Sequence, residues 1–272
     1  MTPTTRIAPP GRLVELNLGD LWTYRELLYF FVWRDLKVRY EQTFIGVTWV
    51  ILQPVLTMIA FSLLFGRLAG LPSDQMPYPI FYFSGLLPWT YFSQSTTRAT
   101  NTLVDNQRVI TKVYFPRILL PVAAVLAGLV DFAIGFVVLA IMLPFYRIMP
   151  TAVWALPFFV ALSVAAALAI GLWLSALHAL YRDVRYAVQF LLTFWMFVSP
   201  VAYPSSLVPA RWRWLYGLNP MAGAIDGVRW SLGAQHPPDP ALLVASTVAV
   251  VLLLLGGVAY FQHVDETVAD VV

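Results

Sequence analysis

The chain has 272 residues, of which 60% are hydrophobic, 15% aromatic and only 11% charged, and its mean hydropathy is +0.73. A soluble domain has about 45 to 50% apolar and about 25% charged residues, so this composition excludes a soluble protein and predicts an integral membrane protein. The net charge of +3 is small and dispersed, there is no cysteine, and the three histidines are isolated, so nucleic-acid binding, thiol chemistry and a metal site are not expected.

The N-terminal part of the chain predicts a tail followed by a helix at the membrane surface. Residues 1–20 are rich in proline, indicate a loose cytoplasmic tail and lack the pattern of a signal peptide. Residues 21–41 combine charged and aromatic residues, and Arg34, Lys37 and Glu41 share one arc of a helical wheel. We expect an amphipathic interface helix lying on the membrane. A soluble helix packed on the protein is the alternative.

Six apolar segments within residues 42–262 predict an all-α transmembrane domain. Spanning ~30 Å of hydrocarbon takes roughly 20 helical residues. The second segment contains Gly85 and Pro88 and becomes polar from Ser93 onward, so a broken or partly re-entrant span is expected there. An acidic cytoplasmic tail is expected at residues 263–272. The six predicted spans are residues 44–65, 80–97, 118–143, 153–177, 187–201 and 241–261.

Between the second and third spans lies a polar hinge, residues 101–120, with the sequence NTLVDNQRVITKVYFPRILL. Desolvating each of its ions would cost at least ~2.5 to 3.5 kcal/mol, so the hinge lies outside the bilayer. In a helix, Arg108 and Lys112 would stand four residues apart on one face, and Pro116 would end it. Such a short helix could dock a soluble partner or anchor the loop to lipid head groups. The residues alone leave both open.

The basic residues predict which side of the membrane each loop occupies. All but five of the 17 Lys and Arg residues lie in the N-terminal region, around the hinge or in the short loop HALYRDVRY, residues 178–186. The positive-inside rule therefore places both termini, the hinge and this loop in the cytoplasm. Residues 203–233 are too polar to cross the membrane and too aromatic for water. They predict short extracytoplasmic helices in the interface.

The sequence carries no recognisable catalytic constellation. It has two lysines, and neither belongs to a phosphate-binding loop. Asp131 is the clear ionisable residue within a predicted span, about 13 residues or ~20 Å into the third. It stands alone, without the second acid, histidine or lysine of a proton relay or hydrolytic site. A functional intramembrane acid and a satisfied packing or subunit contact are the two interpretations.

Several ordered sequence blocks carry a resemblance to a known family. They are RDLKVRYEQTFIGVTWVILQP at residues 34–54, KVYFPRILLP at 112–121, YRDVRY at 181–186, FWMFVSPVAYP at 194–204, LNPMAGAIDGVRW at 218–230, and VADV near the end. From about Arg25 onward, the chain resembles the membrane subunit of type-2 ATP-binding-cassette exporters of lipid-linked polysaccharides in bacteria. The family often has Glu where Asp226 stands, and more basic residues at the positions of Gln262 and His263.

The resemblance implies a multi-pass permease of the bacterial inner membrane rather than an enzyme. It implies a homodimer of six-span subunits with two cytoplasmic ATPases, which bind ATP and Mg, so this chain itself needs no cofactor. It favours ATPase docking for the hinge, an N-terminal interface helix, and gate helices between spans five and six. The ATPase-coupling residues would be Asp105, Arg108, Lys112, Tyr114, Arg117, Arg182, Asp183 and Arg185; the interface-helix residues Arg34, Lys37 and Glu41; the gate residues Trp212, Trp214, Tyr216, Asp226, Arg229 and Trp230.

The expected function is ATP-driven export of a lipid-linked polysaccharide, with O-antigen as the first candidate and capsule or teichoic acid as alternatives. Sugar C–H faces pack on aromatic rings, so a path between two subunits could be lined by aromatics, although aromatic residues at span ends also form ordinary interface belts. A secondary transporter and a membrane enzyme are the alternatives. The first would require several buried charges or an inverted repeat, and the second clustered acids or histidines, and the sequence shows none of these. The predicted path residues are Tyr82, Trp89, Tyr91, Phe92, Phe194, Trp195 and Phe197.

Overall fold

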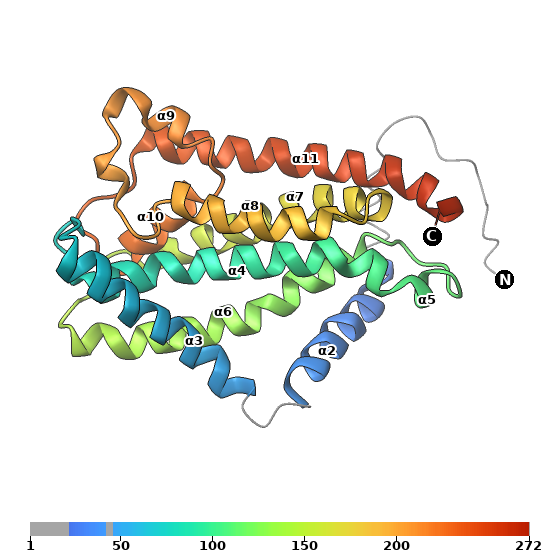
Figure 1. The fold of residues 1–272 in the computed structure, drawn as a ribbon, viewed down its shortest axis with the longest axis horizontal. Helices are drawn as coiled ribbons and strands as arrows, with labels where there is room; N and C mark the ends of the chain where they lie inside the picture. Colours follow the sequence, from blue (N-terminus) through green and yellow to red (C-terminus); the bar gives the residue numbers. More distant parts are fainter. Residues whose placement is uncertain (1–21, 42–45, 272) are drawn as a thin grey trace.

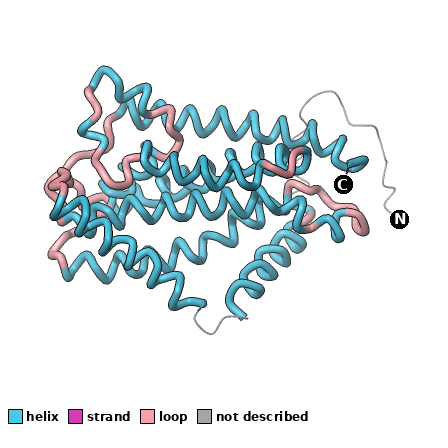
Figure 2. Tube along the Cα trace, in the orientation of Figure 1, coloured by secondary structure: helices cyan, strands magenta, loops and turns pink. Residues whose placement is uncertain are grey.

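The computed structural model describes residues 22–41 and 46–271, and these ranges contain helices and no strand (Figures 1 and 2). The predicted tail at residues 1–20 and the start of the first predicted span lie outside the described residues. The main helices are α2 (Arg25–Glu41), α3 (Gly46–Phe61) with a π-helical continuation (Ser62–Leu68), α4 (Tyr78–Asp105), α5 (Gln107–Ile110), α6 (Leu119–Phe145), α7 (Leu156–Leu180), α8 (Val184–Val198), α9 (Arg213–Tyr216), α10 (Ala222–Ser231) and α11 (Pro240–Val271). Single 3₁₀ turns lie at Val153–Ala155, Ser205–Leu207 and Ala210–Trp212.

Four helical stretches are long and apolar enough to cross a membrane: Thr48–Leu68, Leu119–Phe145, Val153–Leu180 and Pro240–Asp265. Helix α8 is a shorter apolar helix, and α4 runs alongside the others in Figure 1. In chain order, the six predicted spans correspond to α3, α4, α6, α7, α8 and α11. The prediction of an all-α integral membrane fold is confirmed.

Helix α4 is the central helix of the bundle and differs from its prediction. It runs unbroken for 28 residues through Pro88, so the expected break is wrong. The helix tolerates proline because α6, α7 and α10 pack around it and its side chains from Ile80 to Trp89 are buried. Gly85 leaves room for a neighbouring guanidinium: a Cβ there would lie 2.4 Å from Nη2 of Arg229.

The two ends of the bundle differ. We call one end the hinge end, because it holds α5, the connection from α7 to α8 and the last turns of α11 (Figure 1). Helices α9 and α10 lie at the opposite end. Helix α11 continues through Val271, so most of the predicted tail at residues 263–272 is helical, and its cytoplasmic location stays a prediction. The first turns of α2 and the last turns of α11 therefore both lie at the hinge end (Figure 1).

Helix α10 is buried, whereas the sequence predicted a helix lying in the membrane interface. It packs on α4, α7 and α11. Its small residues permit this close approach, as at helix contacts in membranes generally. A Cβ at Gly223 would lie 2.0 Å from Oγ of Ser246, and one at Gly227 would lie 2.0 Å from Cδ1 of Phe159.

We expect Gly227→Ala to lower the free energy of unfolding by about 1 to 3 kcal/mol, the usual cost of overpacking a core. The added methyl group must displace the ring of Phe159, which is itself buried. Thermal unfolding of the purified protein in detergent would measure this. The matched control is the double variant Gly227→Ala with Phe159→Leu. Its loss in free energy of unfolding should be smaller than the sum of the losses in the two single variants. Strict additivity would contradict the steric explanation.

Candidate functional site

The hinge is a short helix followed by turns. Helix α5 covers only Gln107–Ile110, so Lys112 lies beyond it and the predicted helix is shorter than expected. Helix-like turns continue past α5, since the backbone N–H of Val113 donates to the carbonyl of Val109 at 3.0 Å. None of the residues of α5 is buried, which explains why the helix ends early.

The outer surface of the hinge presents charge and one aromatic ring. The side chains of Asp105, Arg108 and Lys112 are exposed, and that of Tyr114 is 93% exposed. At the same end, the connection from α7 to α8 exposes Arg182, Asp183 and Arg185. Among the predicted coupling residues, these seven are therefore accessible at the hinge end of the molecule. We call them the hinge surface.

The inner side of the hinge is fixed to helix α2. The ring of Phe115 is buried with its centroid 5.4 Å from that of Phe31 on α2. Nη1 of Arg34 donates to Oδ1 of Asn106 at 2.9 Å. The hinge and α2 therefore form one packed unit, so a displacement of either would reach the other.

Helix α2 is less amphipathic than predicted. Phe31 is its buried residue, whereas Tyr29, Phe30 and Trp33 are exposed. Lys37 and Glu41 form an exposed ion pair at 3.5 Å. A helix that presents both aromatic rings and ions to its surroundings suits the level of lipid head groups.

Arg117 differs from the other predicted coupling residues because it faces inward. Its side chain is only 19% exposed and its Nη1 lies 3.1 Å from Oδ1 of Asp265 on α11. The same nitrogen donates to the backbone carbonyl of Asp265 at 3.2 Å. In the single subunit Arg117 braces the hinge against α11. Its contact with a partner stays a prediction.

Asp131 is not isolated, which corrects the sequence prediction. It accepts hydrogen bonds from Arg39 and from the hydroxyl of Tyr40, both on α2, and from Nη2 of Arg98 on α4 at 3.2 Å. Its side chain is 16% exposed. Burial, followed by the hydrogen bond to Asp131, raises the pKa of Tyr40 to about 12. We call these four residues the ionic node. It joins α2, α4 and α6.

Sequence reasoning missed the node because it placed Arg39 and Arg98 outside the membrane and Asp131 within it. A signal was available, since α2 is followed by only a short connection to α3 and its last residues must lie near the bundle. Two arginines near a single intramembrane acid could thus have been paired. The node fits the interpretation of Asp131 as a satisfied packing residue.

A large cavity lies beside the node, between α3, α4, α6 and α8. Its volume is about 1070 Å³, and Arg39, Arg98 and Asp131 line part of its wall. Further polar lining comes from amide and hydroxyl side chains of α3, α4 and α8. Trp89 and Tyr91 also contribute to the wall.

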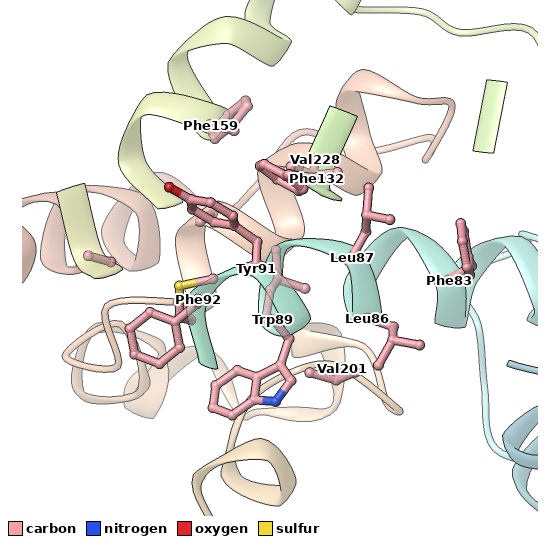
Figure 3. Packing of buried hydrophobic residues seen from close by; sticks show 14 of the residues in the cluster. Phe83, Leu86, Leu87, Trp89, Tyr91, Phe92, Phe132, Phe159, Val201 and Val228 are labelled. Atoms are coloured by element: carbon pink, nitrogen blue, oxygen red, sulfur yellow. The ribbon is translucent and has the colours of Figure 1, made fainter. Parts of the chain in front are cut away.

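Three of the predicted path residues on α4 lie in the core shown in Figure 3, namely Trp89, Tyr91 and Phe92. The ring of Tyr82 stacks on Phe61 with centroids 4.7 Å apart, and that of Tyr91 stacks on Phe132 at 4.6 Å. Phe92 meets the edge of Trp195 at 5.5 Å. Tyr82, Trp89, Tyr91 and Phe92 are all buried, because α4 is covered by other helices. The prediction that these four rings line a path between two subunits stays a prediction, and in the single subunit Trp89 and Tyr91 contribute to the cavity wall.

The predicted path residues on α8 are arranged differently. Phe194 and Phe197 are 61% and 57% exposed and point away from the bundle's core. Trp195 is half-buried and its Nε1 donates to Oδ1 of Asn219 at 3.1 Å. Of the predicted track, Phe194 and Phe197 therefore remain available to a second molecule.

The predicted gate residues divide into surface and core. Trp212 and Trp214 are exposed, whereas Trp230 packs against Trp154, with ring centroids 6.0 Å apart. The hydroxyl of Tyr216 is hydrogen-bonded to that of Tyr203 at 3.0 Å.

Arg229 and Asp226 form the buried centre of this end. Nε of Arg229 donates to the carbonyl of Phe81 at 3.2 Å and Nη2 to that of Val201 at 2.6 Å. Nη1 lies 3.5 Å from Oδ1 of Asp226. Burial raises the pKa of Asp226 and lowers that of Arg229. The arginine thus ties α10 to α4 and to the chain after α8.

Among the side chains that the structure describes, residues 22–41 and 48–265, no group of three His, Asp or Glu could hold a metal ion. The fold and these sites define a multi-pass integral membrane protein, with apolar helices, a charged surface at one end and a polar cavity beside the central helix.

The chain belongs to the ABC-2 type transporter family, whose model matches residues 26–232. It is 32% identical over 256 residues to an O-antigen export system permease protein RfbA of Myxococcus xanthus, covering 92% of this chain and 97% of the relative. It is 27% identical over 215 residues to the RfbA protein of Klebsiella pneumoniae, covering 78% and 81% of the two chains. The polysialic acid transport protein KpsM of Escherichia coli is 21% identical over 240 residues, covering 86% and 91%. The family resemblance read from the sequence blocks is confirmed.

Proposed function

We propose that this chain is the membrane subunit of an exporter that moves a lipid-linked polysaccharide, O-antigen first, out of the cytoplasm across the bacterial inner membrane. Two copies would assemble with two separate ATPase subunits, which bind ATP and Mg. The relatives named as O-antigen export permeases support this substrate, and the more distant KpsM supports a capsular polysaccharide as the alternative.

The observation that carries the proposal is the hinge surface. Its charged side chains are exposed on a segment that connects α4 directly to α6 and is braced by α2 and, through the ion pair of Arg117 with Asp265, by α11. An exposed surface on such a rigid support can receive a push from a soluble partner and pass it to the membrane helices. Orientation of this end toward the cytoplasm follows from the distribution of basic residues.

In the proposed mechanism, ATP-driven closure of the two ATPases displaces the hinge and α2 together. The helices joined to them would then part at the contact between the two permease copies. One subunit offers a cavity of about 1070 Å³, which is too small for a polymer, so the path forms between copies. Helix α8 suits this position because Phe194 and Phe197 are exposed.

The test is purification of the tagged chain from its native membrane in mild detergent, with identification and stoichiometry of the proteins that accompany it. We expect an ATP-binding subunit at a ratio of one to one, and loss of surface polysaccharide when the gene is removed. A chain that purifies without an ATPase yet transports by itself would contradict the proposal and favour a secondary transporter.

We expect Phe194→Ala with Phe197→Ala to lower export several-fold without destabilising the subunit. Aromatic packing contributes about 0.5 to 1.5 kcal/mol per pair, and both rings are exposed in the single subunit. Quantified surface polysaccharide would measure export, and thermal unfolding would measure stability. Phe158→Ala is the control, since Phe158 is an exposed ring on α7. Normal export by the α8 variant would exclude these rings from the path.

A further inference from the structure

Helix α8 has a hollow on each of two faces. One is the polar cavity beside α4, and the other is an apolar hollow of about 450 Å³ between α7 and α8. At 100° per residue, the α8 side chains that line the two hollows are centred about 150° apart, so the hollows lie on nearly opposite sides of the helix. The polar cavity is lined from α8 by Gln189, Thr193 and Met196, and the apolar hollow by Val188, Leu191, Leu192, Phe194, Trp195 and Val198.

The part of α8 between these hollows is loosely packed. Val188 and Leu192 are its buried residues. From Val184 to Phe194, no side chain forms a hydrogen bond or an ion pair with another helix in the described part of the chain. Helices in a protein interior are normally packed without such voids, because each void forfeits dispersion contacts. This part of α8 therefore has room to move toward either hollow.

The opposite end of α8, which ends at Val198 and which we call the outer end, is fixed by Asn219. Nδ2 of Asn219 donates to Oγ of Ser199 at 2.9 Å, and its Oδ1 accepts from Nε1 of Trp195 at 3.1 Å. The same oxygen accepts from the backbone N–H of Met221, just before α10, at 3.1 Å. One amide therefore ties the last turn of α8 to the beginning of α10.

The chain that leaves the outer end is held as well. The carbonyl of Val201 accepts from Nη2 of Arg229 on α10 at 2.6 Å, and that of Ala202 accepts from the hydroxyl of Tyr78 on α4 at 2.7 Å. Arg229 is only 4% exposed, so its charged donor acts where water does not compete. The outer end of α8 is therefore a fixed point, in contrast to the rest of the helix.

The inner end of α8 follows directly on the hinge surface. Helix α8 begins at Val184, next to Arg182 and Asp183 of the connection from α7. The backbone N–H groups of Tyr186 and Ala187 donate to the carbonyl of Asp183 at 3.0 and 3.3 Å, which makes the connection continuous with the first turn of the helix. A displacement of the connection therefore reaches α8 without an intervening loop.

We propose that α8 pivots about its outer end, which Asn219 and Arg229 hold in place, and that its inner end moves into the apolar hollow beside α7. The pivot rests on the proposed ATP-driven export and identifies the helix that moves in it. Because α8 has 15 residues and is ~22 Å long, a rotation of about 15° displaces its inner end by about 6 Å. The polar cavity on the other face of α8 widens as the helix leaves it.

The first experiment blocks the apolar hollow with Ile170→Trp and Leu174→Trp, two residues of α7 that line it. We expect export to fall about tenfold or more, with ATPase recovery unchanged and the unfolding temperature not lowered, because indole rings in an empty hollow add contacts. The matched control, Ile141→Trp with Leu252→Trp, makes the same changes at exposed positions of α6 and α11 and should export normally.

The second experiment measures the motion itself. The chain has no cysteine, so spin labels can be attached at Tyr186→Cys or Val198→Cys, each paired with Leu255→Cys on α11. Helix α11 is a suitable reference, since Nε1 of Trp173 on α7 donates to the carbonyl of Leu253 at 2.9 Å. The labelled chain is mixed with an excess of unaltered chain, so that few assemblies carry two labelled copies.

Double electron–electron resonance compares the nucleotide-free assembly with the assembly trapped by ATP and vanadate. We expect the distance between residues 186 and 255 to change by about 5 Å, and that between residues 198 and 255 by less than about 2 Å. The two tryptophan substitutions in α7 should abolish the first change.

The pivot is overturned if both distances change alike, if neither changes, or if the α7 tryptophan variant exports normally. Should that variant fail to fold, the two distances in the otherwise unaltered chain decide the matter. Export by an unaltered chain whose α8 stays in place would reject the pivot and keep the proposed function. Absence of both ATPase and export from the unaltered chain would reject the function itself.

Discussion

Reversing the charges of Arg108 and Lys112 to glutamate is expected to remove the ATPase from the purified complex and abolish export. Both side chains are exposed on the hinge surface, and each reversal turns an attractive contact with an acidic partner into a repulsive one. A loss of about 2.7 kcal/mol corresponds to a hundredfold weaker association, enough to lose the partner during purification.

The appropriate control keeps the net charge change and moves it to the other end of the bundle. Arg147 and Arg211 are exposed there, and their joint reversal to glutamate should leave ATPase recovery unchanged. Quantitative mass spectrometry of the purified material compares both variants. Equal ATPase recovery from the two would show that the hinge surface is not the docking site.

Asp131→Asn is expected to lower the free energy of unfolding by about 3 kcal/mol. Removing one member of a buried charge cluster typically costs about 3 to 5 kcal/mol, because the remaining charges lose their compensation. The node is partly accessible, with side chains 16 to 30% exposed, so the lower value applies. Thermal unfolding of the purified protein measures the loss, and faster proteolysis within α2 would show that this helix is released first.

A second substitution separates charge imbalance from lost packing. Arg39→Gln in the Asp131→Asn background removes one of the two positive charges left in the node and restores its original net charge. The loss of stability in the double variant should therefore be smaller than the sum of the two single losses by at least about 1 kcal/mol. Asp131→Asn without any loss of stability would mean that the node does not hold α2 to the bundle.

The membrane class, the hinge and the helical order were predictable from the sequence because they depend on local composition. Long apolar segments, and a charged segment between two of them such as residues 105–112, can be recognised without any knowledge of tertiary contacts. The family was predictable from the ordered sequence blocks, and the matching family model spans residues 26–232.

The errors concern contacts between distant parts of the chain. Pro88 and Gly85 indicate a break only when the helix is considered alone, and burial by three neighbouring helices overrides that preference. The partners of Asp131 lie 91, 92 and 33 residues away. The burial of the aromatic rings of α4 could not be predicted either, because composition does not say which face of a helix is covered.

The brace between Arg117 and Asp265 also bears on the order of biosynthesis. The two residues are 148 positions apart, and α11 emerges from the ribosome after the other membrane helices. Until α11 has been inserted, the hinge lacks this support, although its exposed charges are already in place. In a nascent subunit the hinge is therefore held by α2 alone, and its second support is added only when the last helix has joined the bundle.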